Sequence, residues 1–459
     1  MKNGRLSTRL LSLLASDNPG ELKRLGSSLN PVRLAEALAQ LPADQAWRAL
    51  AALAPANKSA VFANLGEEMQ SDLAQTLPRA DFAEILTHMP PDERVDLLKR
   101  IPEDRQETVL PALAQAERED IRRLTAYPEG TAGAVMTSDY AVLRPELTVA
   151  EALARLRREA PDKETIYYCY VVDHARRLVG FVSLKDLILA RPEVTVDQVM
   201  HRDLIAARVD EDQEEAARKI AKYDLLALPV VDPRGVLVGI VTHDDAIDII
   251  NQEHTEDLEK FMAISGSHEP GAYLRTTAWK HFLNRVYWIV GLAAVGLVSG
   301  LVIHHFEATL VNLLILALYM PMLADTGGNT GSQAATVVVR ALALHEVRPR
   351  DLWRIMWKEL RVAVLLAAIL GVLSFGKVLF LSGGTPLPAG FSLPKVGLVI
   401  SLALGFQVVS ATLIGAVLPL CAAKLKLDPA VVASPALTTI VDITGLLIYF
   451  GTAKVMLGV

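Results

Sequence analysis

The chain has 459 residues, of which 51% are hydrophobic and 21% are charged, and its formal net charge at pH 7 is -6. This length exceeds that of one compact domain, so several structural units are expected. Residues 1–275 hold 45 acidic and 33 basic side chains, whereas residues 276–459 hold only 7 and 13. The acidic front half argues against nucleic acid as a partner, because phosphate binding needs a basic surface, and favours cations.

The N-terminus predicts an amphipathic helix over residues 1–16 that stays in the cytoplasm. Its apolar run, Leu10–Ala15, is shorter than the core of a signal peptide. The only two cysteines are Cys169 and Cys421, one in each half of the chain. Neither a disulfide framework nor a cysteine-based zinc site is therefore expected.

A 12-residue repeat occupies the front of the chain. Proline favours the first turn of a helix, so each unit predicts one short helix that is restarted by the next proline. Stacking of these helices predicts an all-α superhelical domain over residues 1–130. The repeated apolar positions are Leu41, Leu53, Leu65, Leu77, Met89, Ile101 and Leu113, and the prolines that follow four of them are Pro42, Pro78, Pro90 and Pro102.

Residues 131–252 contain two copies of a longer unit, which opens with Val135-Met136-Thr137 and again with Val199-Met200-His201. Each copy predicts an amphipathic helix, a pair of strands joined by a turn, and a further helix. A Gly opens the second strand of each pair, at Gly180 and Gly239. This β-turn-β-α order, twice repeated, resembles a tandem CBS pair of α/β type.

CBS pairs often bind adenine nucleotides through the Ser or Thr and the Asp that follow the last strand. Here these residues are Ser183 with Asp186, and Thr242 with Asp245. A plain helix cap explains both aspartates equally well.

Residues 253–280 form an acidic segment that connects the CBS pair to the apolar half. Four carboxylates fall within the seven residues from Glu253 to Glu259. A solvated linker helix would explain them. Beside a pore, however, such a helix would place negative charge where a permeating cation emerges.

Residues 281–459 are expected to form an α-helical transmembrane domain of five helices. Basic residues between the second and third spans, from Arg340 to Arg361, assign that loop to the cytoplasm. The acidic half then also lies in the cytoplasm, the loop Leu381–Pro394 is external, and the C-terminus lies outside. The predicted spans are Val286–Ile303, Ala308–Ala324, Val362–Gly376 with Val378–Leu393, Val396–Ala423 and Pro429–Ala453.

Three features of the apolar half are candidates for ion chemistry. One is Asp428 at the cytoplasmic start of the last span, which its position at a helix N-terminus also explains. The segment Pro321–Gln333, expected inside the second helix, is rich in Gly and contains Asn329, which permits either close helix packing or an opened backbone whose carbonyls face an ion. Asp442 has 13 uncharged residues before it and 11 after it, so it is expected near the bilayer midplane. A lone carboxylate is tolerated there when it faces water or an ion.

The whole order of segments resembles the MgtE family of magnesium channels. The sharpest parts of the resemblance are the Pro321–Gln333 motif and Asp442 within Thr438–Gly445. The resemblance implies a homodimer whose pore follows the two-fold axis, with Asp442 of both subunits at the ion site.

The resemblance also implies regulatory magnesium sites on cytoplasmic carboxylates and an ATP site on the CBS pair that includes Asp186. The implied regulatory residues are Asp92, Asp96, Glu214, Asp224, Asp245, Asp248, Glu253, Glu256 and Asp428.

The sequence therefore predicts a magnesium channel or transporter of the cell (inner) membrane that imports Mg²⁺ and is closed by cytoplasmic Mg²⁺. Mg²⁺ keeps most of its waters and needs only one or two carboxylates, whereas copper or zinc would need Cys, His or Met clusters that the spans lack. A broader divalent transporter that also passes Co²⁺, a proton-coupled carrier and a membrane-anchored nucleotide sensor are the alternatives. An enzyme is not expected, because no nucleophile and base are readable together.

Overall fold

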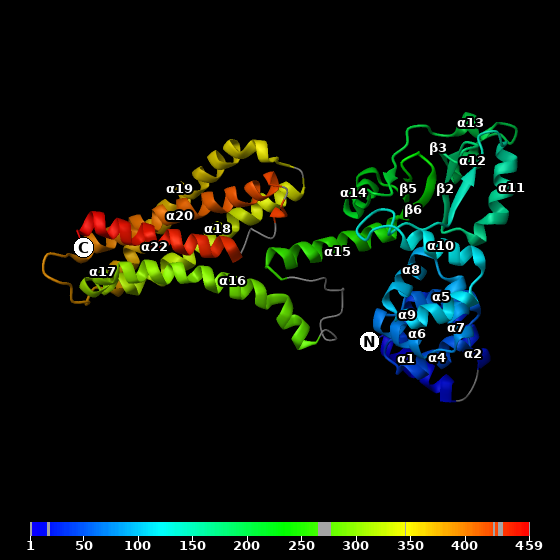
Figure 1. Ribbon diagram of the computed structural model, residues 1–459, viewed down its shortest axis with the longest axis horizontal. Helices are drawn as coiled ribbons and strands as arrows, with labels where there is room; N and C mark the ends of the chain where they lie inside the picture. Colours follow the sequence, from blue (N-terminus) through cyan, green and yellow to red (C-terminus); the bar gives the residue numbers. More distant parts are fainter. Residues whose placement is uncertain are drawn as a thin grey trace. The chain divides into compact units, whose positions relative to one another are not determined.

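The computed structural model describes residues 2–15, 19–264, 277–344, 346–425, 427–429 and 435–458. The chain divides into two compact units, Met1–Asn251 and Gln252–Val459 (Figure 1).

The first part of the N-terminal unit is a helical stack in which every second helix packs together. α3 contacts α5, α5 contacts α7, and α7 contacts α9, while α4, α6 and α8 form the other row. The expected superhelical domain is therefore confirmed. Its helices are α1 (Lys2–Ala15), α2 (Pro19–Ser28), α3 (Pro31–Leu38), α4 (Ala43–Ala51), α5 (Pro55–Ala63), α6 (Glu67–Thr76), α7 (Arg79–His88), α8 (Pro91–Arg100), α9 (Glu103–Val109), η1 (Leu110–Ala112) and α10 (Gln115–Thr125).

The 12-residue repeat marks the junctions between these helices. All seven repeated apolar residues are buried, and Leu77, Met89 and Ile101 are the C-cap residues of α6, α7 and α8. The four prolines lie one position earlier than expected, since Pro42, Pro78, Pro90 and Pro102 are N-caps rather than residues of the first turn. An extended N-cap suits proline equally well, because its fixed φ is compatible and no amide hydrogen is needed there.

The rest of the N-terminal unit holds two three-stranded sheets of the same topology. The repeat predicted the antiparallel strand pair of each sheet, but not the short first strand, β1 or β4, that lies beside it. In each sheet the first strand is parallel to the second, and the second is antiparallel to the third. The first copy contains β1 (Tyr140–Leu143), α11 (Val149–Glu159), η2 (Ala160–Asp162), β2 (Thr165–Val172), β3 (Leu178–Ser183) and α12 (Leu184–Leu189). The second contains α13 (Val196–Val199), β4 (Ala207–Arg208), α14 (Gln213–Tyr223), β5 (Ala227–Val231), β6 (Leu237–Thr242) and α15 (His243–Phe261).

The opening segment of each CBS copy pairs with the other copy. Thr137 exchanges backbone hydrogen bonds with Ile240 of β6. Met136 lies against Gly239, where an added Cβ would come within 2.4 Å of its sulfur, and Met200 lies against Gly180 at 2.8 Å. The repeated Met of each copy thus packs against the repeated Gly of the other copy.

The acidic connecting segment is not a separate helix. α15 runs without a break from His243, directly after β6, to Phe261, so the predicted boundary at residue 252 falls inside one helix. The last part of the predicted connecting segment, residues 265–276, lies outside the described residues.

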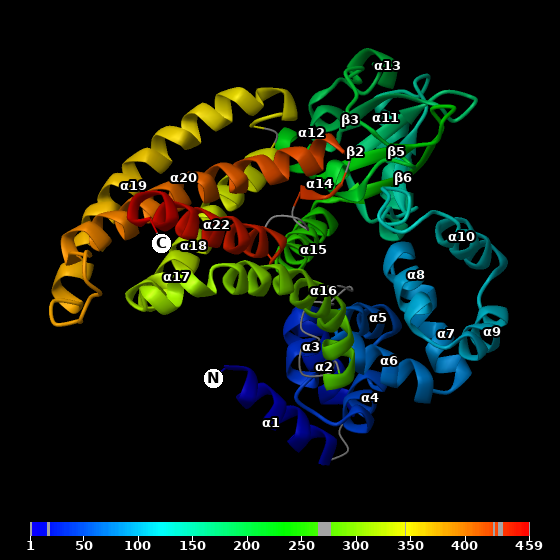
Figure 2. The same cartoon turned by 60° about the vertical axis from the view of Figure 1, so that its left-hand side comes forward.

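The C-terminal unit contains five long helices in its described part, and α20 contacts α18, α19 and α22 (Figure 2). Four of the five are apolar enough to cross a membrane by length and composition, and α18 is the less apolar one. The helices are α16 (Ala278–His305), α17 (Glu307–Asn312), α18 (Ile315–Ala343), η3 (Pro349–Asp351), α19 (Leu352–Leu381), α20 (Leu393–Lys424) and α22 (Pro435–Leu457).

The predicted second span has the wrong limits. The run Ala308–Ala324 comprises short α17 and the first part of α18, which continues to Ala343 through the whole Gly-rich motif. The backbone of the motif is therefore helical rather than opened. The third span is likewise α19 alone, because Val378–Leu393 divides between the end of α19 and the segment 382–392 that precedes α20.

Candidate ion pathway and acidic cluster

Asp442 lies on α22 where that helix packs against α18 and α20. Its neighbour Val441 is fully buried together with Ala335 of α18, Ala411 of α20 and Leu437 of α22. Asp442 itself is half-buried. The carboxylate is thus attached to the tightly packed seam of three helices while keeping access to the surface of the chain.

Gln407 of α20 lies buried at this seam and was not singled out by the sequence. Its Nε2 donates a hydrogen bond of 2.9 Å to the carbonyl oxygen of Val441. Its Oε1 is buried without a partner among the described residues. A buried polar side chain in an apolar unit is costly, which marks the position as functional or structurally specific.

Two glycines make room for the Gln407 amide. A Cβ added to Gly327 of α18 would lie 2.3 Å from Nε2, and one added to Gly445 of α22 would lie 2.4 Å from it. Slightly further along, a Cβ on Gly415 would lie 2.2 Å from the carbonyl oxygen of Gly331. Of the two interpretations of the Gly-rich motif, close helix packing is therefore the one that the structure supports.

Asp325 is a second carboxylate inside a long helix of this unit. The uncharged run of the predicted span ended at Ala324, but the motif that contains Asp325 was expected inside the second helix, and α18 confirms this by placing Asp325 ten residues after its first residue, Ile315. Its Oδ1 accepts a hydrogen bond of 3.2 Å from Asn329 Nδ2. The side chain is exposed on the single chain.

The end of α15 meets Asp428. Lys260 Nζ lies 2.7 Å from Glu256 and 3.4 Å from Asp428. Burial, followed by the charge of Asp428, raises the pKa of Asp257. Phe261 packs against the apolar cluster that includes Val441. The connecting helix is therefore joined to the helix seam beside Asp442 by one ion pair and one aromatic side chain.

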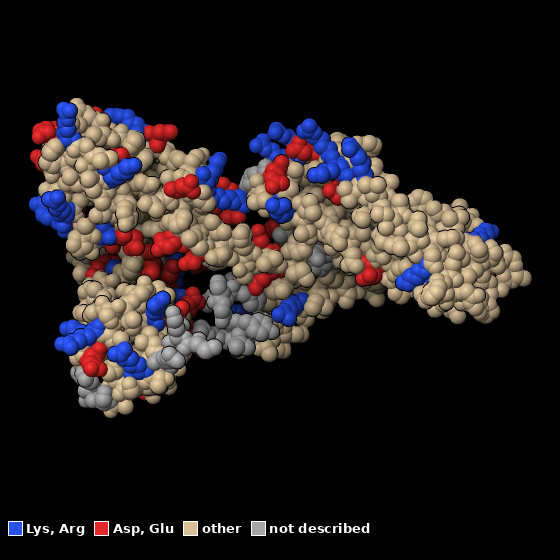
Figure 3. All heavy atoms as spheres, turned by 180° about the vertical axis from the view of Figure 1, so that it is seen from behind, with Lys and Arg blue, Asp and Glu red and all other residues tan. Residues whose placement is uncertain are grey.

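The N-terminal unit holds a cluster of carboxylates contributed by α8, by the residue directly before β2 and by α15. Figure 3 shows acidic side chains gathered in a hollow between the helical stack and the CBS pair. Burial, then the charges of Asp245, Glu93 and Glu164, raises the pKa of Asp92 well above its ordinary value. One oxygen of Asp92 is buried without a partner among the described residues.

Glu93 and Glu164 belong to the same cluster, although the sequence does not predict this, since helix capping explains the first and no motif marks the second. Glu93 remains accessible to solvent within the hollow, but the surrounding protein displaces bulk water. That desolvation, together with Glu164 and Asp245, raises the pKa of Glu93 to about 7. Burial and the charges of Asp245 and Asp244 also raise the pKa of Glu164. Negative charges held this close attract a cation.

The other implied regulatory residues lie outside the centre of the cluster or make local contacts. Asp96 is exposed beside Lys99, at 3.8 Å, and Asp248 is exposed one turn after Asp245. Glu214 forms an ion pair of 2.5 Å with Arg218. Asp224 is the left-handed C-cap of α14 with φ 51°. Among the described residues, no three Asp, Glu, His or Cys side chains come close enough to form a ready-made metal site.

Both CBS aspartates cap helices. Ser183 Oγ donates to Asp186 over 2.6 Å at the start of α12, and Thr242 makes the same contact with Asp245. The capping interpretation is confirmed for both. Asp186 also contacts His201 Nε2 at 3.1 Å, so its carboxylate has a partner from each CBS copy.

Comparison with known families agrees with this architecture. Residues 320–452 match the MgtE family, described as a divalent cation transporter, residues 29–130 match the MgtE intracellular N domain, and residues 132–193 and 196–252 match the CBS domain. With the apolar helices, these matches define a membrane transporter or channel rather than an enzyme.

Relatives extend over almost the whole chain. The chain is 40% identical over 453 residues to the magnesium transporter MgtE of Thermus thermophilus, and the alignment covers 93% of this chain and 98% of that protein. It is 34% identical to the magnesium transporter MgtE of Bacillus subtilis, covering 99% and 98%. The chain belongs to the MgtE family.

Two solved structures resemble the N-terminal part. The soluble part of a magnesium transporter aligns with TM-score 0.53 at 32% identity, covering 55% of this chain and 99% of that one. The cytosolic domain of the Mg²⁺ channel MgtE in complex with ATP aligns with TM-score 0.50 at 38% identity, covering 53% and 99%.

Proposed function

We propose that this protein imports Mg²⁺ as a homodimer and that cytoplasmic Mg²⁺ closes it. The observation that carries the transport proposal is Asp442, a half-buried carboxylate at the packed seam of α18, α20 and α22. Relatives at 34% and 40% identity are magnesium transporters. A homodimer brings two copies of Asp442 to a shared axis and gives a hydrated divalent ion two negative charges.

The acidic cluster supports the regulatory part of the proposal. Carboxylates that are desolvated and close together repel one another, and a bound Mg²⁺ relieves this repulsion. Mg²⁺ therefore favours the arrangement in which α8 lies against the CBS pair. Asp92 and Asp245 are its proposed central ligands, with retained waters, and Glu93 and Glu164 add charge around them.

The connecting helix supplies the proposed link to the pore. Glu253 and Glu256 lie on α15, whose end carries both the Lys260 contact with Asp428 and the packing of Phe261 beside Val441. A shift of α15 would therefore reach the helix that carries Asp442. Because Mg²⁺ binds the closed arrangement better, rising cytoplasmic Mg²⁺ lowers its own influx.

We further propose that the CBS pair binds an adenine nucleotide near Asp186. A relative's cytosolic domain was solved in complex with ATP. Asp186 contacts His201, and the His201 ring lies 5.2 Å from that of Phe181, centroid to centroid. These aromatic rings give an adenine base a surface on which to stack.

The transport proposal is tested by Mg²⁺ uptake into proteoliposomes that contain the full chain. Asp442→Asn keeps the size of the side chain and removes its charge, so uptake should fall to the level of empty vesicles. Glu346→Gln removes one carboxylate between α18 and α19, at an exposed position, and should leave uptake unchanged. Wild-type uptake in the Asp442→Asn protein, with its thermal unfolding intact, would refute the proposal.

A further inference from the structure

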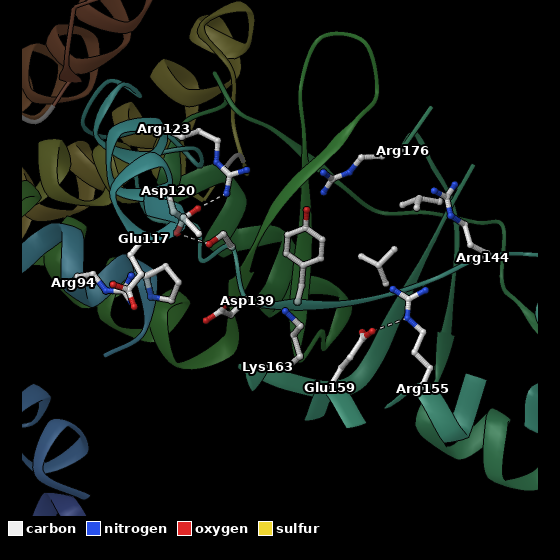
Figure 4. Close-up of a pocket in the computed structure, with 16 residues that line it drawn as sticks. Arg94, Glu117, Asp120, Arg123, Asp139, Arg144, Arg155, Glu159, Lys163 and Arg176 are labelled. Atoms are coloured by element: carbon white, nitrogen blue, oxygen red, sulfur yellow. Dashed lines mark hydrogen bonds and ion pairs between the residues drawn. The ribbon is translucent and has the colours of Figure 1, made fainter. Parts of the chain in front are cut away.

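The N-terminal unit contains a basic pocket of about 640 Å³ that is separate from the acidic hollow. α8 and α10 of the helical stack form one wall, and β1, α11 and the turn after β2 of the first CBS copy form the other (Figure 4). This volume suits a ligand of nucleotide size.

Cations exceed carboxylates in this pocket, although residues 1–275 as a whole are strongly acidic. Two of the arginines are already neutralised: Arg123 pairs with Asp120 at 2.5 Å, and Arg155 pairs with Glu159 at 2.8 Å. The remaining charged residues that line the pocket are the cations Arg94, Arg144, Lys163 and Arg176 and the carboxylates Glu117 and Asp139. Among the described residues, none of these four cations forms an ion pair with a carboxylate.

The remaining cations are held in place by contacts that leave donors available. Arg94 is buried, donates to the Met89 carbonyl at 2.8 Å, and keeps its Nε without a partner among the described residues. Arg144 donates to the carbonyl of Asp173. Arg176 lies beside the hydroxyl of Tyr140. The guanidinium groups thus retain hydrogen-bond donors that can bind an anion.

The pocket differs from the nucleotide position expected of a CBS pair. Neither Ser183 with Asp186 nor Thr242 with Asp245 lines it. Instead the pocket lies between two domains. They are linked beside it by a hydrogen bond of 2.7 Å, which Ser138, before β1, donates to Asp120 of α10. A ligand in it would touch the helical stack and the first CBS copy at once.

We propose that this pocket binds an anion with two or three linked phosphates, supplied either as a nucleoside polyphosphate or as free polyphosphate. Guanidinium groups recognise phosphate oxygens in a bidentate manner, and Lys163 adds a point charge. The site is independent of the proposed transport function.

Binding of this anion is coupled to the acidic cluster through α8. That helix places Arg94 in the pocket, whereas the adjacent Asp92 and Glu93 lie in the acidic cluster. An anion that holds α8 to the first CBS copy therefore favours the arrangement that Mg²⁺ also favours. By linkage, the anion raises the affinity for Mg²⁺ and Mg²⁺ raises the affinity for the anion by the same factor.

The test is calorimetric titration of the full chain in detergent, without Mg²⁺, using tripolyphosphate, pyrophosphate, ATP and adenosine as separate probes. The double variant Lys163→Gln/Arg176→Gln should bind tripolyphosphate at least tenfold more weakly than the wild type. Arg157→Gln/Arg158→Gln removes two exposed charges of α11 that do not line the pocket, and should bind as the wild type. Equal affinity in the two double variants would overturn the proposal.

The probes distinguish the two sources of phosphate. If ATP and tripolyphosphate compete for one site that Lys163→Gln/Arg176→Gln weakens and Asp186→Asn does not, the pocket accepts a nucleoside polyphosphate. If only tripolyphosphate and pyrophosphate depend on Lys163 and Arg176, the pocket accepts free polyphosphate. Both results support the site. The proposal would be overturned if Asp186→Asn weakened the binding of every probe and Lys163→Gln/Arg176→Gln weakened none.

A second measurement needs no substitution. Acetylation of Lys163 in the wild-type chain, followed by mass spectrometry, should slow at least fivefold when tripolyphosphate is present. Lys222 on α14 is exposed and remote from the pocket lining, so it should react at an unchanged rate. Equal acetylation of Lys163 with and without tripolyphosphate would show that the pocket does not bind it.

Discussion

Gln407 Nε2 donates its hydrogen bond to the carbonyl oxygen of Val441, the residue directly before Asp442. The amide occupies the space that Gly327 and Gly445 leave open on α18 and α22. One buried side chain of α20 therefore fixes the spacing of the two neighbouring helices at the level of the proposed ion site. The position of Asp442 depends on this contact, because its backbone is held one residue away.

The first prediction concerns the glycines around Gln407. Gly327→Ala or Gly445→Ala would place a methyl group on the Gln407 amide, an overpacking that costs about 1–3 kcal/mol. We expect lower thermal stability and Mg²⁺ uptake reduced at least tenfold in proteoliposomes. Gly328→Ala is the matched control, since its added Cβ would lie 3.8 Å from the nearest neighbour, Thr438 Cγ2. A Gly328→Ala protein as impaired as the other two would contradict this account.

The second prediction concerns the carboxylates of the connecting helix. Glu253→Gln/Glu256→Gln should keep the channel open at millimolar cytoplasmic Mg²⁺ without changing the ion that passes. These side chains lie on α15 ahead of the contacts with Asp428 and the helix seam. Patch recording with Mg²⁺ on the cytoplasmic face measures the effect, and Glu259→Gln serves as a single-charge control on the same helix. Closure of the double variant at the wild-type Mg²⁺ concentration would count against the gating scheme.

The repeats of the N-terminal half could be predicted from sequence because their signals are local. A proline followed by a short helix, or a strand-turn-strand unit with Gly180 near the start of its second strand, is encoded within a short stretch of neighbouring residues. The acidic cluster is different, because Glu93 and Glu164 meet only through packing of α8 against the CBS pair. These two residues are far apart in the sequence, so no local pattern predicts that they lie close together in space.

The membrane half shows a second reason for error. The uncharged run that marks the second span ended at Ala324 because Asp325 is charged, although the Gly-rich motif was expected inside the second helix. Helix packing overrides this local signal: α18 continues through the motif because small residues allow α20 to approach closely. Gln407 was overlooked for a related reason, because a single amide in a long apolar run has no visible partner until α22 is placed beside it.

The third prediction concerns Lys260, which lies between Glu256 and Asp428. Lys260→Gln leaves these carboxylates and Asp257 without their nearby cation, so a bound Mg²⁺ relieves more repulsion than in the wild type. All are partly exposed, and screened pairs of this kind contribute about 0.2–1 kcal/mol. We therefore expect the Mg²⁺ concentration for half-closure to fall about threefold. Lys280→Gln, on α16, is the control and should leave this concentration unchanged. A higher Mg²⁺ concentration for half-closure in Lys260→Gln would contradict the prediction and show that the lysine assists closure.

The fourth prediction concerns the pH dependence of Mg²⁺ binding at the acidic cluster. The pKa of Glu93 is about 7, above its ordinary value of 4.5, because of desolvation and the charges of Glu164, Asp245, Asp244 and Asp96. A carboxyl group with a raised folded-state pKa destabilises the fold when ionised, so the Mg²⁺-free unit should lose stability as pH rises from 4.5 through 7. Mg²⁺ prefers the ionised group and displaces its proton, so its affinity should rise over the same range.

Protease protection of residues 1–275 by Mg²⁺, titrated at pH 6 and pH 8, measures this dependence. Because Glu93 changes from mostly protonated to mostly ionised between these values, the Mg²⁺ concentration for half-protection should fall about tenfold at pH 8. Glu93→Gln should remove most of that difference while still showing protection, since Asp92 and Asp245 remain. Glu103→Gln, at the exposed start of α9, should behave as the wild type. An equal pH effect in the wild type and Glu93→Gln would mean that another carboxylate of the cluster takes up the proton.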